Sequence, residues 1–341
     1  MPLGAEKAGL LGSAGAGGGA RGILGGGSSD PLGATNSITY ITIPTTSDTT
    51  DFGDLLGTMY QGGCASNGSS DRGLFMAGQW PTLNNNTIEY ITISTPGNAT
   101  DFGDALIKSS VMYNQSGVSN NTNDRMVNAG GYCNPCTPNA QQSMMNYVTI
   151  SSTGDATDFG DLSIRRNAFG ITSNGTNERG IAYYGSVPFT PCAAQWNSID
   201  YWTINSPGNS TDFGDGTSKG SENASFSNLT NERGISAGLF LDCTTPPFVY
   251  GGSDVIDYIT INSTGNATDF GNCVTGSSSV RGCSDGTAER GVFGGGMTGS
   301  GSPQTQTNIL QYITINSAGD ATDFGDTATK IKIGGMCSDA D

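Results

Sequence analysis

The chain has 341 residues, of which 53 are glycine and none is histidine, and its formal net charge at pH 7 is −16. Nucleic-acid binding needs a basic surface, so this acidity argues against a nucleic-acid partner. The lack of histidine in the sequence excludes Ser-His-Asp and Cys-His catalysis and every histidine-ligated metal site.

The first 20 residues are rich in glycine and alanine, and we expect a flexible N-terminal arm at 1–20. Lys7 is the single cation of this arm and lies beside Glu6, and glycines interrupt every apolar run. The arm therefore lacks the pattern of a secretory signal. No run of about 18 apolar residues occurs in the sequence, so we predict no membrane span.

Three recognisable segments follow the arm and recur six times. The first is an arginine strand, as in RGILGGG at 21–27, and its arginines are Arg21, Arg72, Arg125, Arg179, Arg233 and Arg290. The second is a YITI-like strand, and its tyrosines are Tyr40, Tyr90, Tyr147, Tyr201, Tyr258 and Tyr312. The third is the tetrad DFGD (once DFGN), and its first aspartates are Asp51, Asp101, Asp158, Asp212, Asp269 and Asp323.

The spacing of these segments indicates the architecture. Each tyrosine precedes its tetrad aspartate by 11 residues, and successive tetrads are 50 to 57 residues apart. Periods of this size are typical of propellers, solenoids and arrays. A further segment between each tetrad and the next arginine, such as LSIRRNAFGITS at 162–173, raises the number of short β segments to four per repeat. Four strands per repeat is the composition of a propeller blade.

The two ends of the chain complement each other. The repeats begin with an arginine strand that has no segment before it, and the chain ends, after the sixth tetrad, with a segment that no arginine strand follows. CSDAD at 337–341 matches CSDG at 283–286, which lies just before an arginine strand. We therefore predict an all-β fold at 21–341: a six-bladed β-propeller of four-stranded blades, closed by a C-terminal strand that pairs with the N-terminal blade. An open solenoid, with an edge to cap, is the alternative.

One arginine and one tetrad aspartate occur in every repeat, and six of the fourteen cations lie at the arginine position. We interpret the six arginines and the six first aspartates as a structural ring of ion pairs. Phe52 and its equivalents are expected to pack between blades. Asn or Asp upstream of the tetrad, as at Asn98 and Asn209, is interpreted as turn chemistry. Calcium, held by the tetrad aspartates and the upstream Asn or Asp, is the alternative to the ion pairs, although we predict no cofactor and no metal.

The eight cysteines do not form a recognisable framework. CNPC at 133–136 has no second pair at zinc spacing, so the metal reading of this motif is weak. Cys64, Cys283 and Cys337 occupy nearly equivalent positions and are interpreted as small buried apolar residues. The remaining three lie in or near loops, where disulfides would form in an oxidising medium; they are Cys192, Cys243 and Cys273.

Length varies mainly in one connection of the repeat. The distance from arginine to tyrosine ranges from 18 to 25 residues, which places the variation between the second and third strands. Variable loops on a rigid frame commonly carry recognition, and aromatic side chains suit stacking on sugars or contact with protein surfaces. Alternatively, these side chains cap the end of the propeller or pack between blades. The candidate ligand-binding aromatics are Trp80, Tyr132, Phe189, Trp196, Phe248 and Tyr250.

The order of glycine doublet and aromatic residues in the repeat resembles the kelch repeat. More closely, the pattern YITI-x-S-x-G-N-A-T-D-F-G-D is similar to the repeats of kelch-like proteins from marine and cyanobacterial tailed phages. The resemblance covers about residues 21–337. It implies a virion component on the exposed surface of the particle, although a fold alone does not fix a function.

These observations together predict a non-enzymatic structural protein of a phage virion, assembled in the host cytoplasm. We expect it in a tail fibre or other adhesion structure, or in a capsid decoration, with no catalytic residue. Its expected partners are other virion proteins, through the arm at 1–20, and a host surface glycan. Two alternatives stay open: a carbohydrate-active enzyme that uses carboxylates, and an intracellular interaction scaffold of the kelch kind.

Overall fold

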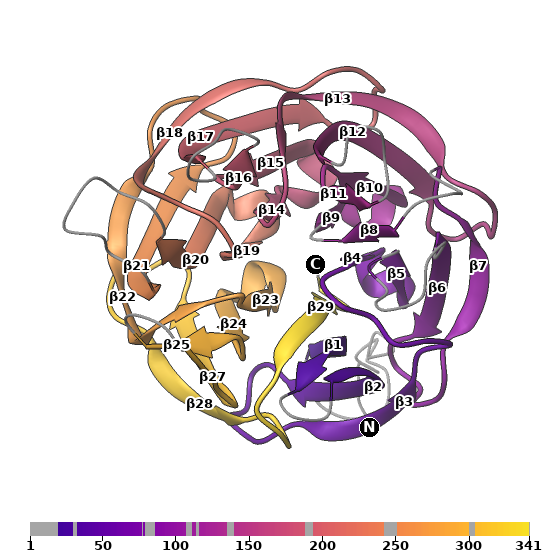
Figure 1. Ribbon diagram of the computed structural model, residues 1–341, viewed down its shortest axis with the longest axis horizontal. Helices are drawn as coiled ribbons and strands as arrows, with labels where there is room; N and C mark the ends of the chain where they lie inside the picture. The colour runs from indigo at the N-terminus through magenta and orange to yellow at the C-terminus, as the bar shows by residue number, and fades with distance from the viewer. Residues whose placement is uncertain are drawn as a thin grey trace, which may run out of the picture.

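A computed structural model describes residues 20–29, 33–76, 78, 86–106, 111–113, 116–134, 140–187, 194–241, 251–299 and 304–340. The chain forms six antiparallel sheets around a central axis, which confirms the six-bladed β-propeller (Figure 1). Among the described residues, no helix has the length and apolar character needed to cross a membrane. The arm expected at 1–20 lies outside them except for Ala20, whose carbonyl accepts the N–H of Ile43 at 2.8 Å.

Each blade has four main strands, ordered from the centre of the ring outward. The first blade has β29 (Lys332–Ser338), β1 (Arg21–Ser29), β2 (Gly33–Thr42) and β3 (Thr50–Asp54). The second has β4 (Gly63–Ser66), β5 (Arg72–Met76), β6 (Thr87–Thr92) and β7 (Thr100–Asp104). The third has β9 (Ser116–Ser119), β10 (Arg125–Ala129), β12 (Ala140–Thr149) and β13 (Thr157–Arg166).

The other three blades follow the same order. The fourth has β14 (Gly170–Ser173), β15 (Arg179–Tyr183), β17 (Ala194–Thr203) and β18 (Thr211–Gly220). The fifth has β19 (Ala224–Ser227), β20 (Arg233–Leu241), β21 (Gly251–Thr260) and β22 (Thr268–Ser278). The sixth has β23 (Arg281–Ser284), β24 (Arg290–Gly294), β27 (Ile309–Thr314) and β28 (Thr322–Asp326).

Short elements complete the described part of the fold. Five 3₁₀ turns join the first two strands of blades two to six: η1 (Gly68–Ser70), η2 (Asn121–Asn123), η3 (Gly175–Asn177), η4 (Leu229–Asn231) and η5 (Gly286–Ala288). Five further strands extend the sheets: β8 (Val111–Tyr113), β11 (Tyr132–Asn134), β16 (Ser186–Val187), β25 (Met297–Thr298) and β26 (Thr305–Gln306).

The first blade combines the two ends of the chain. Strand β29 pairs antiparallel with β1, from Gly22 opposite Ser338 to Ser28 opposite Lys332. The closure predicted from the sequence is therefore confirmed, and the open solenoid is not formed. Strand β29 thus supplies the innermost strand of blade one, the place that β4 takes in blade two.

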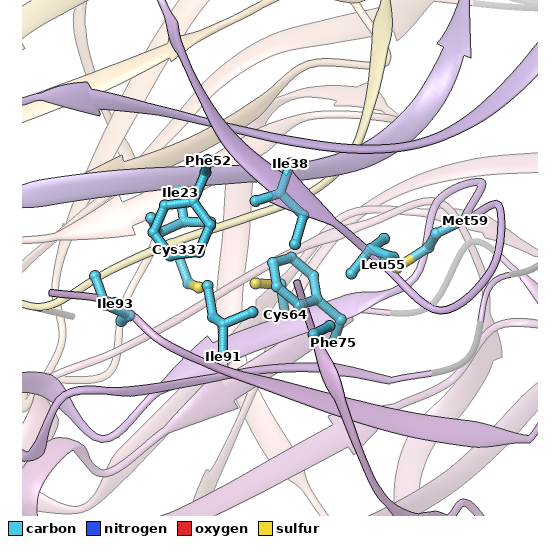
Figure 2. Packing of buried hydrophobic residues seen from close by; sticks show 11 residues of the cluster. Ile23, Ile38, Phe52, Leu55, Met59, Cys64, Phe75, Ile91, Ile93 and Cys337 are labelled. Atoms are coloured by element: carbon cyan, nitrogen blue, oxygen red, sulfur yellow. The ribbon is translucent and has the colours of Figure 1, made fainter. Parts of the chain in front are cut away.

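The hydrophobic core is divided into six clusters, one at each seam between neighbouring blades. Figure 2 shows the cluster between blades one and two, where Ile23, Ile38 and Phe52 of blade one meet Phe75 and Ile91 of blade two. As expected, the tetrad phenylalanines pack between blades, and each is only 2% to 3% exposed: Phe52, Phe102, Phe159, Phe213, Phe270 and Phe324. Each also meets the repeat tyrosine of its own blade edge to face, with ring centroids 6.0 to 6.2 Å apart.

The tetrad joins each blade to the next through its backbone. Asp54 N–H donates to Asn98 Oδ1 of the second blade at 3.0 Å, and Ala99 N–H donates to the carbonyl of Asp54 at 2.8 Å. Gly53, which directly precedes Asp54, has φ of 151°. A Cβ at this position would lie 2.4 Å from the carbonyl oxygen of Gly97. The same side-chain bond recurs in the pairs Asp104–Asp155, Asp161–Asn209, Asp215–Asn266, Asn272–Asp320 and Asp326–Asp48. These upstream side chains therefore accept an N–H from the preceding blade, a contact between blades that the interpretation as turn chemistry did not include.

Candidate functional site: the variable face

The two ends of the ring differ in regularity. Because the strands of a blade alternate in direction, the 3₁₀ turns and the connections between third and fourth strands lie at one end, which we call the constant face. The connections between second and third strands, and those that lead to the next blade, lie at the opposite end, the variable face. Every 3₁₀ turn of the constant face has three residues.

The variable face changes from blade to blade. The outer strands β13, β18 and β22 have 10, 10 and 11 residues, whereas β3, β7 and β28 have five each. Strands β8, β11 and β16 extend the third and fourth blades, and β25 adds to the outer edge of β22 (Figure 1). This end of the ring therefore offers different surfaces on different blades.

Two of the six candidate aromatics lie within the described residues, and both belong to the variable face. Tyr132 on β11 is half-buried and pairs with Gln141 of β12 in the third blade. Trp196 on β17, in the neighbouring fourth blade, is 39% exposed. The other four candidates lie outside the described residues: Trp80, Phe189, Phe248 and Tyr250.

The repeat arginines have different partners from those expected. The Arg21 guanidinium lies 4.5 Å from the centroid of the Tyr40 ring, and its Nη1 donates to the carbonyl of Ile93 in the next blade at 2.7 Å. Across the six blades the guanidinium-to-ring distance is 4.4 to 4.6 Å. The corresponding carbonyls belong to Ile93, Ile150, Ile204, Ile261, Ile315 and Ile43.

The ion-pair ring is therefore corrected to a ring of arginine–tyrosine stacks. Arg21 pairs with Thr42 of β2, whereas Asp51 lies one strand further out on β3, so the third strand of the blade separates them. The six first aspartates are all exposed: Asp51, Asp101, Asp158, Asp212, Asp269 and Asp323. Between described residues, the ion pair that the structure does contain is Arg166–Asp200.

The acidic residues that directly precede the repeat arginines accept hydrogen bonds from residues other than those arginines. Each ends a 3₁₀ turn in the left-handed conformation, with φ between 70° and 78°. Glu178 Oε2 accepts the side-chain N–H of Asn120 in the preceding blade at 2.9 Å, and Asp71 Oδ1 accepts the N–H of Ser94 at 2.7 Å. These carboxylates stabilise the constant face.

A second set of repeated polar residues, most of them buried, was not predicted. We call them the seam residues: they directly precede the repeat tyrosines, and they are Thr39, Glu89, Asn146, Asp200, Asp257 and Gln311. Four of them accept an N–H from the outer strand of the preceding blade or from the residues just after it, the donors being Leu56, Ser163, Thr217 and Val274. The sequence signal was a polar residue repeated at one position of an otherwise apolar strand.

Two seam residues have fully buried carboxylates that accept several hydrogen bonds. Arg166 Nη2 lies 3.0 Å from Asp200 Oδ2, which also accepts the hydroxyls of Ser163 and Ser210 at 2.6 and 2.8 Å. Burial lowers the pKa of Arg166, and Asp200 opposes this shift. Asp257 accepts the hydroxyl of Tyr184. These carboxylates are 0% and 1% exposed, so donors rather than solvent surround them.

The centre of the ring is narrow. Hydroxyl groups on the innermost strands bond to the carbonyls of neighbouring blades, as from Ser173 to Ser119 at 2.7 Å and from Ser227 to Ser173 at 2.6 Å. The cavities along the axis, lined by residues such as Cys64 and Ser225, have volumes of about 50 and 40 Å³. These cavities between described residues are therefore far smaller than typical small-molecule pockets of roughly 300 to 1,000 Å³.

The cysteine predictions have mixed outcomes. Cys64, Cys283 and Cys337 are buried and are not disulfide-bonded, as expected. Cys273 lies within β22 and not in a loop, and burial raises the pKa of its thiol to about 12. Cys133 is disulfide-bonded, so it is not a metal thiolate, while Cys136, Cys192 and Cys243 lie outside the described residues. Within the described chain, no group of three or more acidic or cysteine side chains is arranged to hold a metal.

Comparison with known proteins does not assign the chain to a family. No protein-family model matches the chain. No curated protein matches it either. A functional assignment must therefore come from the residues and the fold.

Proposed function

We propose that the protein is a non-enzymatic structural component of a phage particle, in a tail fibre or a capsid decoration, whose variable face binds a host glycan or a neighbouring particle protein. The contrast between the two ends of the ring carries the binding part of this proposal. The constant face repeats one set of contacts, whereas strand lengths on the variable face differ between blades. The particle role rests on the resemblance of the YITI…DFGD repeat to phage proteins.

The bonding of the ring supports a frame that holds its shape. Each repeat arginine stacks on the tyrosine of its own blade and donates to a carbonyl of the next blade. Six bonds from the tetrad to the upstream residues also connect each blade to the next, and β29 closes the circle. The buried carboxylates of Asp200 and Asp257 are engaged by hydroxyl and cationic donors within this frame. We further propose that the arm at 1–20, which leads into β1, contacts neighbouring particle proteins.

Trp196 is the best-defined position for a test of binding. We expect Trp196→Ala to weaken adhesion of the purified, labelled full chain to host cells at least tenfold, because an exposed indole offers a large stacking surface. Val274→Ala is the matched control, since Val274 is 51% exposed on the outer strand β22. Equal adhesion of the two variants would contradict the proposed face.

The particle role has a separate test. Mass spectrometry of purified particles should detect the protein in constant proportion to the other particle proteins. Its presence in the cytosol of infected cells but never in particles would overturn the particle role. Release of reducing ends from host polysaccharide by the purified chain would favour the carbohydrate-active enzyme instead.

A further inference from the structure

A cavity of about 370 Å³ lies at the seam between the sixth and first blades. Its walls come from described residues of β1 and β2 in blade one and from residues 327–331, which lead from β28 to β29. The volume falls in the lower part of the range of small-molecule pockets, roughly 300 to 1,000 Å³. It is several times larger than either cavity on the central axis.

The cavity lies beside the short seam residue of blade one, Thr39. The five other seam residues are longer or acidic, and each is at most 5% exposed: Glu89, Asn146, Asp200, Asp257 and Gln311. Thr39 takes this position in blade one and lines the cavity instead. In the sixth blade, the N–H equivalent to that of Leu56 belongs to Ala328. It donates to Thr49 Oγ1 at 3.2 Å, so it does not need an acceptor on the seam residue.

The walls combine uncharged hydroxyl groups with an apolar floor. Leu24 and Ile333, 4% and 1% exposed, form part of the floor, and no ionisable side chain is among the lining residues that the structure describes. Within the described chain, the hydroxyls of Ser37 and Thr39 have no hydrogen-bond partner. Thr35 Oγ1 accepts the N–H of Ser37 at 3.1 Å, so its own hydrogen is left to donate.

We infer that this seam binds a neutral monosaccharide. Hydroxyls that both donate and accept match the hydroxyls of a sugar, and the leucine and isoleucine side chains match the C–H face of its ring. A charged sugar is disfavoured because it would have no opposite charge among the described lining residues. The inference concerns a pocket on blades six and one, remote in sequence from Trp196, and it holds whether or not the protein is part of a particle.

The test compares sugars on the full-length protein. We expect at least one of D-glucose, D-galactose and N-acetyl-D-glucosamine to give saturation-transfer NMR signals, and D-glucuronate to give weaker ones. Thr39→Gln places in this seam the side chain that Gln311 contributes in blade six, and it should weaken binding at least tenfold. Thr39→Ser keeps the hydroxyl and should change binding by less than about threefold.

A second variant tests the pocket without changing the side chains that pack between the two blades. Thr329 is exposed at the edge of the cavity, so Thr329→Tyr should block entry and weaken binding to the same degree without altering the seam. Trp196→Ala should leave sugar binding in this pocket unchanged, which separates the inference from the proposed function. Absence of signal with all three neutral sugars, or unchanged binding by both Thr39→Gln and Thr329→Tyr, would overturn it.

Discussion

Each repeat arginine stabilises its own blade and the next one at once. The planar guanidinium of Arg125 lies 4.4 Å from the Tyr147 ring centroid, and its edge donates to the carbonyl of Asn205 at 2.8 Å. Arginine alone combines a face that stacks with several donors in one plane. Spacing identified the arginines and aspartates as repeated residues, but it did not identify their partners, because pairing depends on which strands are neighbours in the sheet.

The seam residues occupy equivalent positions in the six blades but differ in charge and in hydrogen-bond partners. Asp200 has Arg166 and two hydroxyl donors, and Gln311 is neutral. Glu89 is 5% exposed and has the N–H of Leu56 as its donor. Burial raises the pKa of Glu89 to about 7, against the opposing effect of the Leu56 N–H, and Asp101 adds to the rise.

This raised pKa predicts a pH-dependent seam between blades one and two. The pKa of Glu89 rises from 4.5 to about 7 on folding, so the folded state binds the extra proton between these values. The favourable contribution is complete below pH 4.5 and is lost as pH rises through about 7. We expect Glu89→Gln and the wild type to have the same free energy of unfolding at about pH 4.5. At about pH 8 the free energy of unfolding of Glu89→Gln should be larger than that of the wild type by about 1–3 kcal/mol. Urea unfolding across this range checks it, and parallel pH profiles of the two proteins would refute it.

The DFGD strand is the element that sets the spacing between blades. Its glycine sits beside a bulge, as the register shift opposite Ile38 and Thr39 shows in blade one. In blade three, Gly160 has φ of 139°, and a Cβ there would lie 2.5 Å from the carbonyl oxygen of Gly208. The sequence predicted a strand at this place. It did not reveal the bulge, because the need for glycine comes from a backbone on the neighbouring blade.

Two glycines of this contact should respond differently to alanine. Gly160→Ala is expected to lower the free energy of unfolding by about 1–3 kcal/mol, because the new methyl group meets backbone and the φ value is strained. Gly208→Ala is the matched control, since a Cβ there meets nothing within 4 Å, and it should change stability by less than about 1 kcal/mol. Chemical unfolding of both variants measures the difference, and equal losses would show that the blade-to-blade contact does not require glycine.

At the scale of the whole molecule, the ring was predictable because its signal is distributed over the entire chain. Six equal spacings and complementary ends determine both the number of blades and the strand that closes them. The short strands of the variable face were not predictable, since β11 and β16 pair with the longer neighbouring strands β12 and β17, and β8 pairs in turn with β11. The cavity at the closing seam was likewise not predictable, since its lining comes from residues 24–49 and 327–333, which meet only when the ring closes.

Closure by β29 predicts that a covalent link between the chain ends stabilises the entire ring. Ser28 and Lys332 face each other across β1 and β29, so Ser28→Cys with Lys332→Cys should form a disulfide that encloses most of the chain. Because such a link restricts the unfolded state strongly, the oxidised variant should gain about 3–5 kcal/mol over its reduced form in urea unfolding. The single variant Ser28→Cys controls for the native cysteines. Thiol titration that finds no link in the folded double variant would mean that the two ends do not share a sheet.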